Sequence, residues 1–341
     1  MLRIFGALVA WLVMSTNALA LDPGCTTTNL FEDLAVTAPE DYAALRAEID
    51  AIPNARGIFW EVVHPDVDHT SYLFGTFHKA DPRILDLPDS VDSAFGSVDT
   101  VAVELANPRG QMTLTISMAT NPGKFFATDG RRLSQTLDPD TIGPLTDFLV
   151  ERDVNFAEID VLRPWVSISV LSVSTCDLTY GGLGAKVLDE ALIDRAKETG
   201  KTVVGLETIR EQMDTLAGVD EDFYLASLED TARLHAAGLL EDLLRTSTQL
   251  YLAEDVAALL PLSIYYSHLV SPDQDLSEGY AHFEERLLSA RNIGMTENAA
   301  DLILAGPTFV AVGAAHLYGE TGLVAGLRNK GFTVTRIPLK R

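Results

Sequence analysis

Short runs of apolar and β-branched residues recur along the chain and are separated by longer stretches with helical periodicity. These runs predict six strands, because they are short and are bounded by turn-forming residues. They lie at residues 57–63, 72–77, 100–105, 201–206, 308–314 and 332–337. The first two runs flank the polar, turn-rich segment 64–70, which predicts an antiparallel hairpin with an open loop.

Helix-ending glycines precede two of these runs. Gly200 stands before the run at 201–206, and Gly331 stands between the helical stretch 319–330 and the last run. Glycine readily supplies the left-handed residue that ends a helix. A strand, a helix and a strand joined by short loops form a βαβ unit. We therefore expect the strands at both places to have parallel neighbours.

Two long tracts, about residues 130–180 and 220–305, have the spacing of amphipathic helices. We expect them to be helical insertions in a single α/β domain that spans residues 21–341. No repeat of solenoid length and no low-complexity linker divides the chain. The predicted fold class is α/β, with a mixed, largely parallel central sheet.

The composition is that of a globular and strongly acidic protein. Of its 341 residues 47% are hydrophobic, which is enough to bury a large core. The chain carries 49 acidic residues against 25 lysines and arginines, so its formal net charge is -24. Such a surface repels phosphate backbones and anionic lipid head groups. We expect no nucleic-acid partner and no binding to a membrane surface.

Residues 1–20 have the three-part layout of a secretory signal peptide. Arg3 precedes an apolar run from Ile4 to Met14, and small residues end the segment at Ala20. The run is shorter than the ~20 residues needed to cross a bilayer, and no second run of this kind follows. We expect cleavage after Ala20, a periplasmic or secreted protein, and no membrane anchor in the mature form.

Both cysteines, Cys25 and Cys176, follow the expected cleavage point. In an oxidising compartment they can form a disulfide that ties the new N-terminus to the body of the protein. Two free buried thiols are the alternative.

Ionisable residues lie at the ends of four of the predicted strands: His78, Glu104, Glu207 and His316. Ligands of parallel α/β sheets bind at the carboxyl ends of strands, so these residues can meet in one crevice. Two histidines and one or two carboxylates are a common ligand set for a divalent transition metal. Structural roles are the alternative: a hydrogen-bonded or surface histidine, and a glutamate beside the positive end of a helix dipole.

The segments 75–78 and 313–316 share the spacing Gly-x-x-His. Glycine allows the backbone to turn sharply and to approach a site closely. The same spacing after two separate strands favours a common site for both histidines.

With these residues the chain resembles the TraB/PrgY/GumN family, which includes the Tiki proteases. The resemblance spans about residues 55–338. It is carried by Ser-Tyr-Leu-Phe-Gly-Thr-Phe-His at 71–78, by Glu104, by Gly-Leu-Glu-Thr at 205–208 with Glu211 and Gln212, by Arg291 and Asn292, and by Gly-Ala-Ala-His-Leu-Tyr-Gly at 313–319. The resemblance implies a metal-dependent hydrolase with an erythromycin-esterase-like core, in which the motif histidines and glutamate build the site. Asp189 matches a further Gly-x-Asp element only loosely, so we leave it out of the site and expect it to begin a helix.

Our main hypothesis gives each candidate residue a role. His78, Glu104 and His316 hold a divalent cation (Mn, Co or Zn), which lowers the pKa of bound water towards ~7 and polarises a substrate carbonyl. Glu207 is the general base. Arg291 stabilises the oxyanion or binds a substrate carboxylate, with a salt bridge as its alternative role. The expected substrate is a peptide or a small molecule, and the sequence leaves the oligomeric state open.

Two alternatives use the same residues. In the first, an esterase-like hydrolase works without a metal, with His78 as the base on water and Glu104 orienting it. In the second, the crevice belongs to a non-catalytic binder of haem, of a metal complex or of a peptide.

Overall fold

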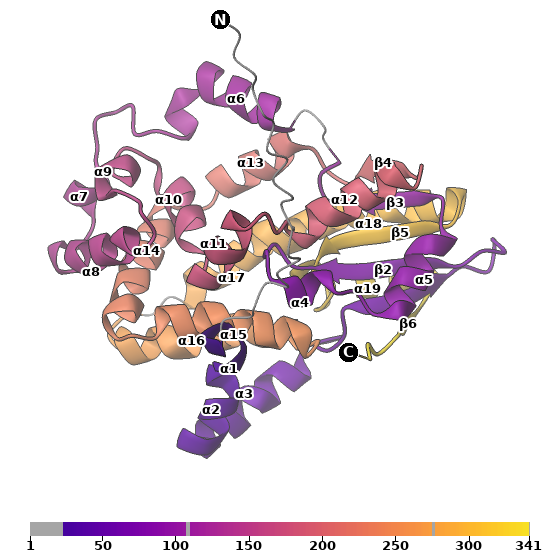
Figure 1. Ribbon diagram of the computed structural model, residues 1–341, viewed down its shortest axis with the longest axis horizontal. Coiled ribbons are helices and arrows are strands. Elements are labelled where there is room, and N and C mark those ends of the chain that lie inside the picture. Colours follow the sequence, from indigo (N-terminus) through magenta and orange to yellow (C-terminus); the bar gives the residue numbers. More distant parts are fainter. Residues whose placement is uncertain (1–22, 107–109, 275–276, 341) are drawn as a thin grey trace, which may run out of the picture.

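The computed structural model describes residues 23–106, 110–274 and 277–340. The expected signal peptide, residues 1–20, lies outside the described residues. One sheet is formed by six strands: β1 Phe59–Val63, β2 Ser71–Thr76, β3 Thr100–Val103, β4 Thr202–Gly205, β5 Thr308–Gly313 and β6 Thr333–Arg336. Their order across the sheet is β4-β3-β5-β2-β1-β6 (Figure 1).

All six predicted strands are confirmed, with ends that differ by at most two residues from the expected ones. The hairpin is confirmed as well, because β1 pairs antiparallel with β2 and places Phe59 opposite Phe74. The four strands β4, β3, β5 and β2 run parallel. The sheet is therefore mixed and largely parallel, as the sequence predicts.

The expectation of a parallel neighbour is correct for β4, which pairs with β3, and wrong for β6. β6 pairs antiparallel with β1, with Trp60 opposite Arg336. Both sides of β5 are already taken, by β2 and by β3. The last strand therefore crosses over the hairpin and joins the outer edge of the sheet.

The central strand β5 explains why the sheet has a core on each face. All six of its residues are buried, as expected for a strand covered on both sides. Because side chains alternate between the faces of a strand, Phe309 and Ala311 belong to one apolar cluster, and Val310 and Val312 belong to another.

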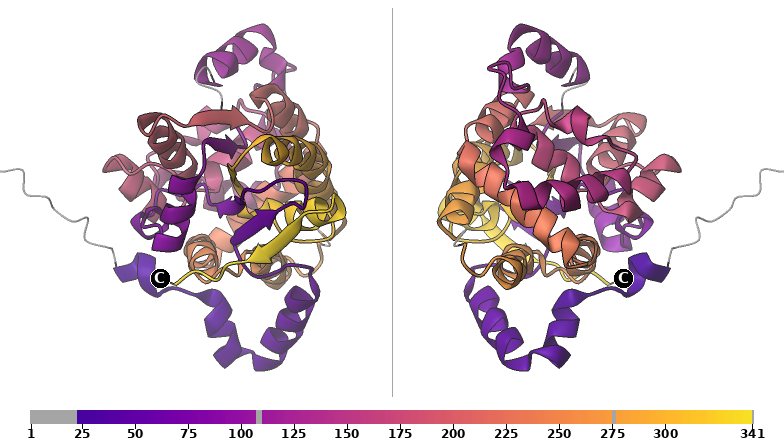
Figure 2. Two further views of the ribbon diagram at one scale, coloured as in Figure 1. Left: turned by 90° about the vertical axis from the view of Figure 1, so that its right-hand side faces the viewer. Right: turned by 90° about the vertical axis from the view of Figure 1, so that its left-hand side faces the viewer.

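Helices make up most of the remaining chain (Figures 1 and 2). Before β1 and between β2 and β3 lie α1 Pro23–Thr27, α2 Leu30–Thr37, α3 Pro39–Ala51, α4 Pro82–Leu85 and α5 Asp89–Ser97. Between β3 and β4 lie α6 Gly110–Thr120, η1 Pro122–Lys124, α7 Leu133–Thr136, α8 Pro139–Val150, α9 Phe156–Ile159, α10 Pro164–Leu171, α11 Thr175–Gly182 and α12 Leu188–Glu198. Between β4 and β5 lie α13 Ile209–Ala217, α14 Glu221–Ala236, α15 Leu240–Leu252, η2 Val256–Ala258, α16 Leu259–Val270, α17 Ser277–Glu284, the π-helix η3 Glu285–Ser289 and α18 Ala290–Ala305. η4 Ala314–His316 and α19 Leu323–Asn329 follow β5.

The two long helical tracts pack against each other beside the sheet. α14 contacts α8, α10 and α16, and the buried side chains of Leu145, Phe148, Leu228 and Leu262 belong to the cluster between them. In Figure 1 these helices lie to the left of the sheet, and Figure 2 shows α6 at the end of the molecule opposite α2 and α3. Among the described residues, no helix is both long enough and apolar enough to cross a membrane.

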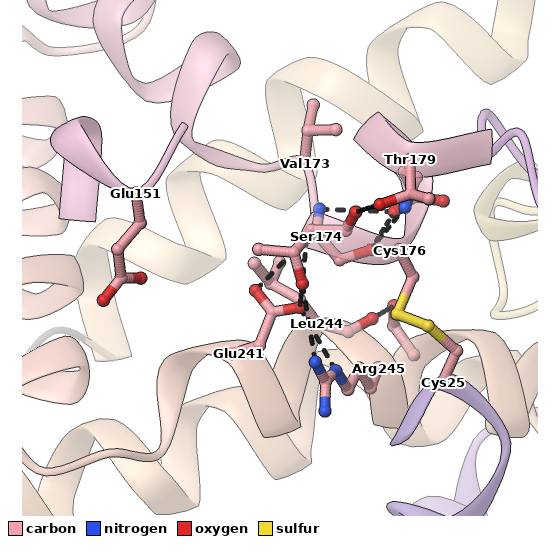
Figure 3. Close-up of polar contacts among 12 residues, drawn as sticks. Cys25, Glu151, Val173, Ser174, Cys176, Thr179, Glu241, Leu244 and Arg245 are labelled. Atoms are coloured by element: carbon pink, nitrogen blue, oxygen red, sulfur yellow. Dashed lines mark hydrogen bonds and ion pairs between the residues drawn. A yellow bond between two sulfur atoms is a disulfide. The ribbon is translucent and has the colours of Figure 1, made fainter. Parts of the chain in front are cut away.

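The expected disulfide is confirmed. Cys25 in α1 is bonded to Cys176 in α11 across 151 positions of the sequence (Figure 3). The same end of α11 is held by α15, because the Glu241 carboxylate accepts hydrogen bonds from the backbone N–H (3.0 Å) and the hydroxyl of Thr175. Within α15, Arg245 Nε donates to the same carboxylate at 3.2 Å and orients it. The N-terminal segment is therefore fixed covalently to the helical tracts.

Candidate active site

The carboxyl ends of the parallel strands meet at one cavity. Its volume is about 480 Å³, and its lining includes His78, Glu104, Arg291, Gly313 and His316. His78 follows β2 by two residues, Glu104 directly follows β3, and His316 ends η4 after β5. Because β3, β5 and β2 are neighbours with one direction, their ends lie side by side and bring together residues that are far apart in the sequence.

Glu104 is buried, with 5% of its surface exposed. Its Oε1 accepts the backbone N–H of Gly313, and its Oε2 accepts Arg291 Nη2 at 3.0 Å. Burial by itself raises the pKa of Glu104, but the interactions with His316 in its protonated form, with His78 and Arg291, and with the Gly313 N–H outweigh it, so the pKa is lowered. Glu104 is therefore an ionised carboxylate inside the protein.

His316 is buried as well, and its ring is oriented by α18. Its Nδ1 lies 2.6 Å from Oδ1 of Asn292. Burial lowers the pKa of His316 to about 4, against the opposing charge of Glu104, so the imidazole is neutral near pH 7. Since Nδ1 carries the proton that it donates to Asn292, Nε2 carries a lone pair. That Nε2 lies 3.7 Å from Glu104 Oε1, too far for a hydrogen bond.

His78 lies on the open side of the cavity, and its side chain is 61% exposed. Its Nδ1 donates a hydrogen bond to Asp189 Oδ2 at 2.8 Å, while Thr76 donates its hydroxyl to Asp189 Oδ1 at 2.7 Å. Desolvation lowers the pKa of His78, but the Asp189 hydrogen bond and the charges of Asp189 and Glu104 raise it more, to about 9. These contacts leave Nε2 as the ring nitrogen that can serve a ligand.

The loop that carries His78 is anchored by the next residue. Lys79 is buried, and its ammonium group donates to the Leu244 carbonyl at 2.7 Å and pairs with Asp177 at 3.2 Å. Burial lowers the pKa of Lys79, and the charge of Asp177 opposes this effect. Asp177 adjoins Cys176, so the anchor connects the site to the helix that the disulfide holds.

Gly313 keeps the centre of the site open. A Cβ atom at this position would lie 2.9 Å from Glu104 Oε1, 3.6 Å from His316 Cδ2 and 3.7 Å from His78 Nε2. Any other residue would therefore fill the space where the three side chains meet. Gly75, the glycine of the other Gly-x-x-His segment, has a different role. A Cβ at Gly75 would lie 2.8 Å from the Ala314 Cβ. Because glycine has no Cβ, β2 can pack against η4.

Glu207 is turned towards Arg291. Its two carboxylate oxygens accept Arg291 Nη2 at 2.5 Å and Nε at 3.0 Å, and Arg291 Nη1 donates to the Leu287 carbonyl at 2.9 Å. Burial raises the pKa of Glu207, although the Arg291 hydrogen bonds oppose this. Arg291 thus joins Glu104 and Glu207 and itself faces the cavity. Glu207 contacts Arg291 and is not among the residues that line the cavity.

The chemistry of these donors fits a divalent cation. Both imidazoles have Nδ1 fixed by an oxygen acceptor, which is the usual orientation of histidine ligands. The lone pair of His316 Nε2 and the charged Oε1 of Glu104 lie 3.7 Å apart without a proton between them, in surroundings where such atoms repel unless a cation joins them. Among the described residues, no group of three or more His, Cys, Asp or Glu side chains is placed so that it could hold a metal ion as the side chains stand.

Three residues of this geometry were not among the site residues predicted from the sequence. Asp189 begins α12 as expected, yet it also contacts His78. Asn292 belongs to a motif of the resemblance, and Thr76 to another, but neither motif reveals which side chain each one contacts. Glu211, from a third motif, caps α13 by accepting the N–H and hydroxyl of Thr208 at 2.8 Å, so it stabilises a helix at the edge of the site.

Known proteins are similar to most of this chain, including the segments that form the site. The model of the TraB/PrgY/gumN family matches residues 58–336. The Metalloprotease TIKI2 of Danio rerio is 27% identical over 333 residues, which cover 84% of this chain and 62% of that protein. The Metalloprotease TIKI1 of Xenopus tropicalis is 26% identical over 317 residues, which cover 80% and 61%. The chain therefore spans about three fifths of the length of these curated relatives. No solved structure matches the chain.

Proposed function

The chain belongs to the TraB/PrgY/gumN family, and on that premise we propose that it is a metal-dependent hydrolase that cleaves peptide bonds. Two relatives are named metalloproteases, which supports the peptidase assignment. The proposal depends most on one observation: His316 Nε2 and Glu104 Oε1 lie 3.7 Å apart, both electron-rich, beside a glycine that leaves room for an ion.

We propose that His78, Glu104 and His316 hold the ion, as Mn²⁺, Co²⁺ or Zn²⁺. A bound divalent cation of this kind makes water a nucleophile near neutral pH and polarises a carbonyl. Asp189 and Asn292 keep both Nδ1 atoms occupied, so each ring presents only Nε2 to the ion. Gly313 contributes by having no side chain.

Arg291 is the residue best placed to stabilise negative charge on a substrate oxygen. Its guanidinium group lines the cavity beside Glu104. The Nε and Nη2 edge is bound by Glu207 and Glu104, and one N–H of Nη1 donates to Leu287, so the second N–H of Nη1 is the donor that an oxyanion or a carboxylate would meet. Glu207 positions the guanidinium group through two hydrogen bonds. Glu207 can act as a general base only after Arg291 releases one of its oxygens, because both oxygens are occupied.

The version without a metal is less well supported. A histidine with a pKa raised to about 9 is largely protonated at pH 7, so His78 would be a weak base in metal-free protein. Without a metal, Glu104 keeps Arg291 as its cation through Oε2, but no cation joins its Oε1 to Nε2 of His316.

We also propose export from the cytoplasm. The disulfide between Cys25 and Cys176 suits an oxidising compartment, and the sequence of residues 1–20 has the layout of a signal peptide.

The experiment compares metal content with peptide cleavage. Protein stripped with a chelator should cleave no member of a peptide library, and the addition of Mn²⁺, Co²⁺ or Zn²⁺ should restore cleavage. His78→Ala and His316→Ala should abolish metal-dependent cleavage, while His268→Ala, at an exposed histidine of α16, should not. Full activity of the stripped protein would overturn the metal proposal, and stoichiometric metal binding without any hydrolysis would instead favour a binding protein.

A further inference from the structure

Much of the cavity lining is apolar. Its lining includes six aliphatic side chains in addition to the polar groups of the site: Leu216, Val256, Leu259, Leu260, Leu287 and Leu288. Three polar residues, Gln212, Ser263 and Glu284, also belong to the lining. An apolar surface of this kind beside reactive groups is typical of a pocket that binds a ligand.

The apolar lining comes from two separate parts of the core. Leu216 and Leu287 pack in the cluster of α13, α14 and η3. Val256 and Leu259 pack in the cluster of the sheet face that includes Phe309. Both η2 and η3 contact η4, which carries His316. The cavity therefore lies between two apolar clusters and directly beside the proposed metal ligands.

Leu260 and Leu288 differ from their neighbours. Both line the cavity and are partly exposed, and neither belongs to a hydrophobic cluster formed by the described residues. Successive helical residues point in different directions. Leu259 packs against a core cluster and also borders the cavity, whereas Leu260 borders the cavity without packing in such a cluster. In η3, Leu287 is buried in a core cluster, whereas Leu288 borders the cavity outside these clusters. η3 is a π-helix, a form that is frequent at functional sites.

The apolar lining is also hydrogen-bonded to Arg291, one of the polar groups of the site. The carbonyl of Leu287 accepts a hydrogen bond from Arg291 Nη1 at 2.9 Å. A substrate side chain that packs against Leu288 would therefore contact η3, the same helix whose Leu287 carbonyl orients the Arg291 guanidinium group. A peptide held there would have its nearest carbonyl close to Arg291 and the proposed metal ligands.

We propose that this apolar part of the cavity is a specificity pocket for a bulky aliphatic or aromatic side chain next to the scissile bond, with Leu260 and Leu288 as its contact residues. This inference rests on the proposed peptidase function and names its substrate class. A leucine or phenylalanine would lose its apolar surface to the pocket, whereas an acidic side chain would meet an apolar wall and the carboxyl of Glu284.

The first experiment is digestion of a mixed peptide library by the purified protein with Mn²⁺, followed by identification of the cleaved bonds by mass spectrometry. Leucine, isoleucine, methionine and phenylalanine should be enriched at one position beside the cleaved bond. In paired peptides that differ only by leucine or serine there, kcat/KM should differ on the order of ten- to hundredfold. Cleavage with no side-chain preference would overturn the pocket and leave the peptidase proposal standing.

Two variants assign the preference to the named residues. Leu260→Gln and Leu288→Gln should reduce the leucine-to-serine ratio to about threefold or less, because a polar group then lines the pocket. Circular dichroism spectra and thermal unfolding curves like those of the parent protein show that the variants are folded. Leu269→Gln, at a 57% exposed leucine of the same helix as Leu260, is the matched control and should leave the ratio unchanged.

A binding measurement separates the pocket from catalysis. The probes are a fluorescein-labelled peptide of glycine and alanine with one central leucine, and the same peptide with serine, each titrated into metal-free protein and followed by anisotropy. Tighter binding of the leucine peptide, lost in Leu260→Gln, supports the pocket even when nothing is cleaved. Equal binding of both peptides contradicts it. Absence of all cleavage together with selective binding contradicts only the peptidase proposal.

Discussion

His78 and Asp189 are joined by a 2.8 Å hydrogen bond between Nδ1 and Oδ2, although 111 positions of the sequence separate them. The bond fixes the ring of the only proposed metal ligand that is exposed, since the His78 side chain is 61% accessible and Glu104 and His316 are buried. Asp189 is itself fixed by the Thr76 hydroxyl. The exposed ligand is thus positioned by a second carboxylate outside the proposed ligand set.

Asp189→Asn should weaken metal binding by about ten- to hundredfold, because the amide keeps a hydrogen-bond acceptor for His78 but removes the charge that makes the imidazole a better ligand. Co²⁺ or Mn²⁺ titration of the stripped protein measures the affinity. Glu190→Gln, at the next position of α12, is the control and should bind as the parent does. Equal affinity for the parent and Asp189→Asn would remove Asp189 from the site.

Gly313→Ala should abolish metal binding and hydrolysis while the protein stays folded. The new Cβ would lie 2.9 Å from Glu104 Oε1 and 3.7 Å from His78 Nε2, in the space that the ion would need. Circular dichroism and a metal titration provide the two readouts. Gly306→Ala is the matched change, because a Cβ there meets no neighbour within 4 Å. Normal metal binding by Gly313→Ala would place the ion elsewhere.

Glu207→Gln tests whether Glu207 positions Arg291 or accepts a proton. Glutamine still offers an acceptor to Arg291, so the positioning role predicts a loss of about tenfold in kcat and an unchanged acid limb of the pH–rate profile. Arg291→Lys, which loses the planar fork, should cost on the order of a hundredfold or more. A loss of a thousandfold in Glu207→Gln, with disappearance of the acid limb, would instead identify Glu207 as the base.

The stability of the metal-free protein should depend on His316 between pH 6.5 and pH 4. Its folded-state pKa, about 4, lies below the ordinary 6.5, so the unfolded chain binds more protons in this range. The stabilisation is complete above pH 6.5 and is lost as the pH falls to 4, by about 3 kcal/mol. The charged groups that also act on the pKa of His316 are Glu104, Arg291 and His78.

Chemical unfolding at a series of pH values measures this effect. His316→Asn, whose amide can replace Nδ1 as a donor to Asn292, should lose less free energy of unfolding than the parent between pH 6.5 and pH 4. The contribution of His78 has the opposite sign, because its pKa is raised to about 9 and its stabilisation is lost as the pH rises through 9. Parallel curves for the parent and His316→Asn would contradict a neutral buried His316.

The strands and their polar ends could be predicted because they depend on local patterns. A run such as Thr308–Gly313 is apolar after its first residue and buried along its whole length, and the His316 motif follows it directly. The place of β6 could not be predicted in the same way. Its local βαβ pattern is the same whether β6 lies beside β5 or crosses two strands, and only the pairing of β5 with β2 and β3 excludes the nearer place.

The partners within the site required the structure. The first-turn position of Asp189 is a local signal, and it is correct, but its contact with His78 depends on how α12 packs against the end of β2. The sequence likewise identified Arg291 and Glu207 as candidates without indicating that they contact each other. Long-range packing, which no short motif encodes, determines both relationships.

Anomalous X-ray diffraction from crystals of the protein loaded with Mn²⁺ or Zn²⁺ tests the central claim most directly. The account predicts one strong peak beside Gly313, about 2.0–2.2 Å from Nε2 of His78, Nε2 of His316 and a carboxylate oxygen of Glu104. A peak elsewhere, or none in this cavity at saturating metal, would contradict it.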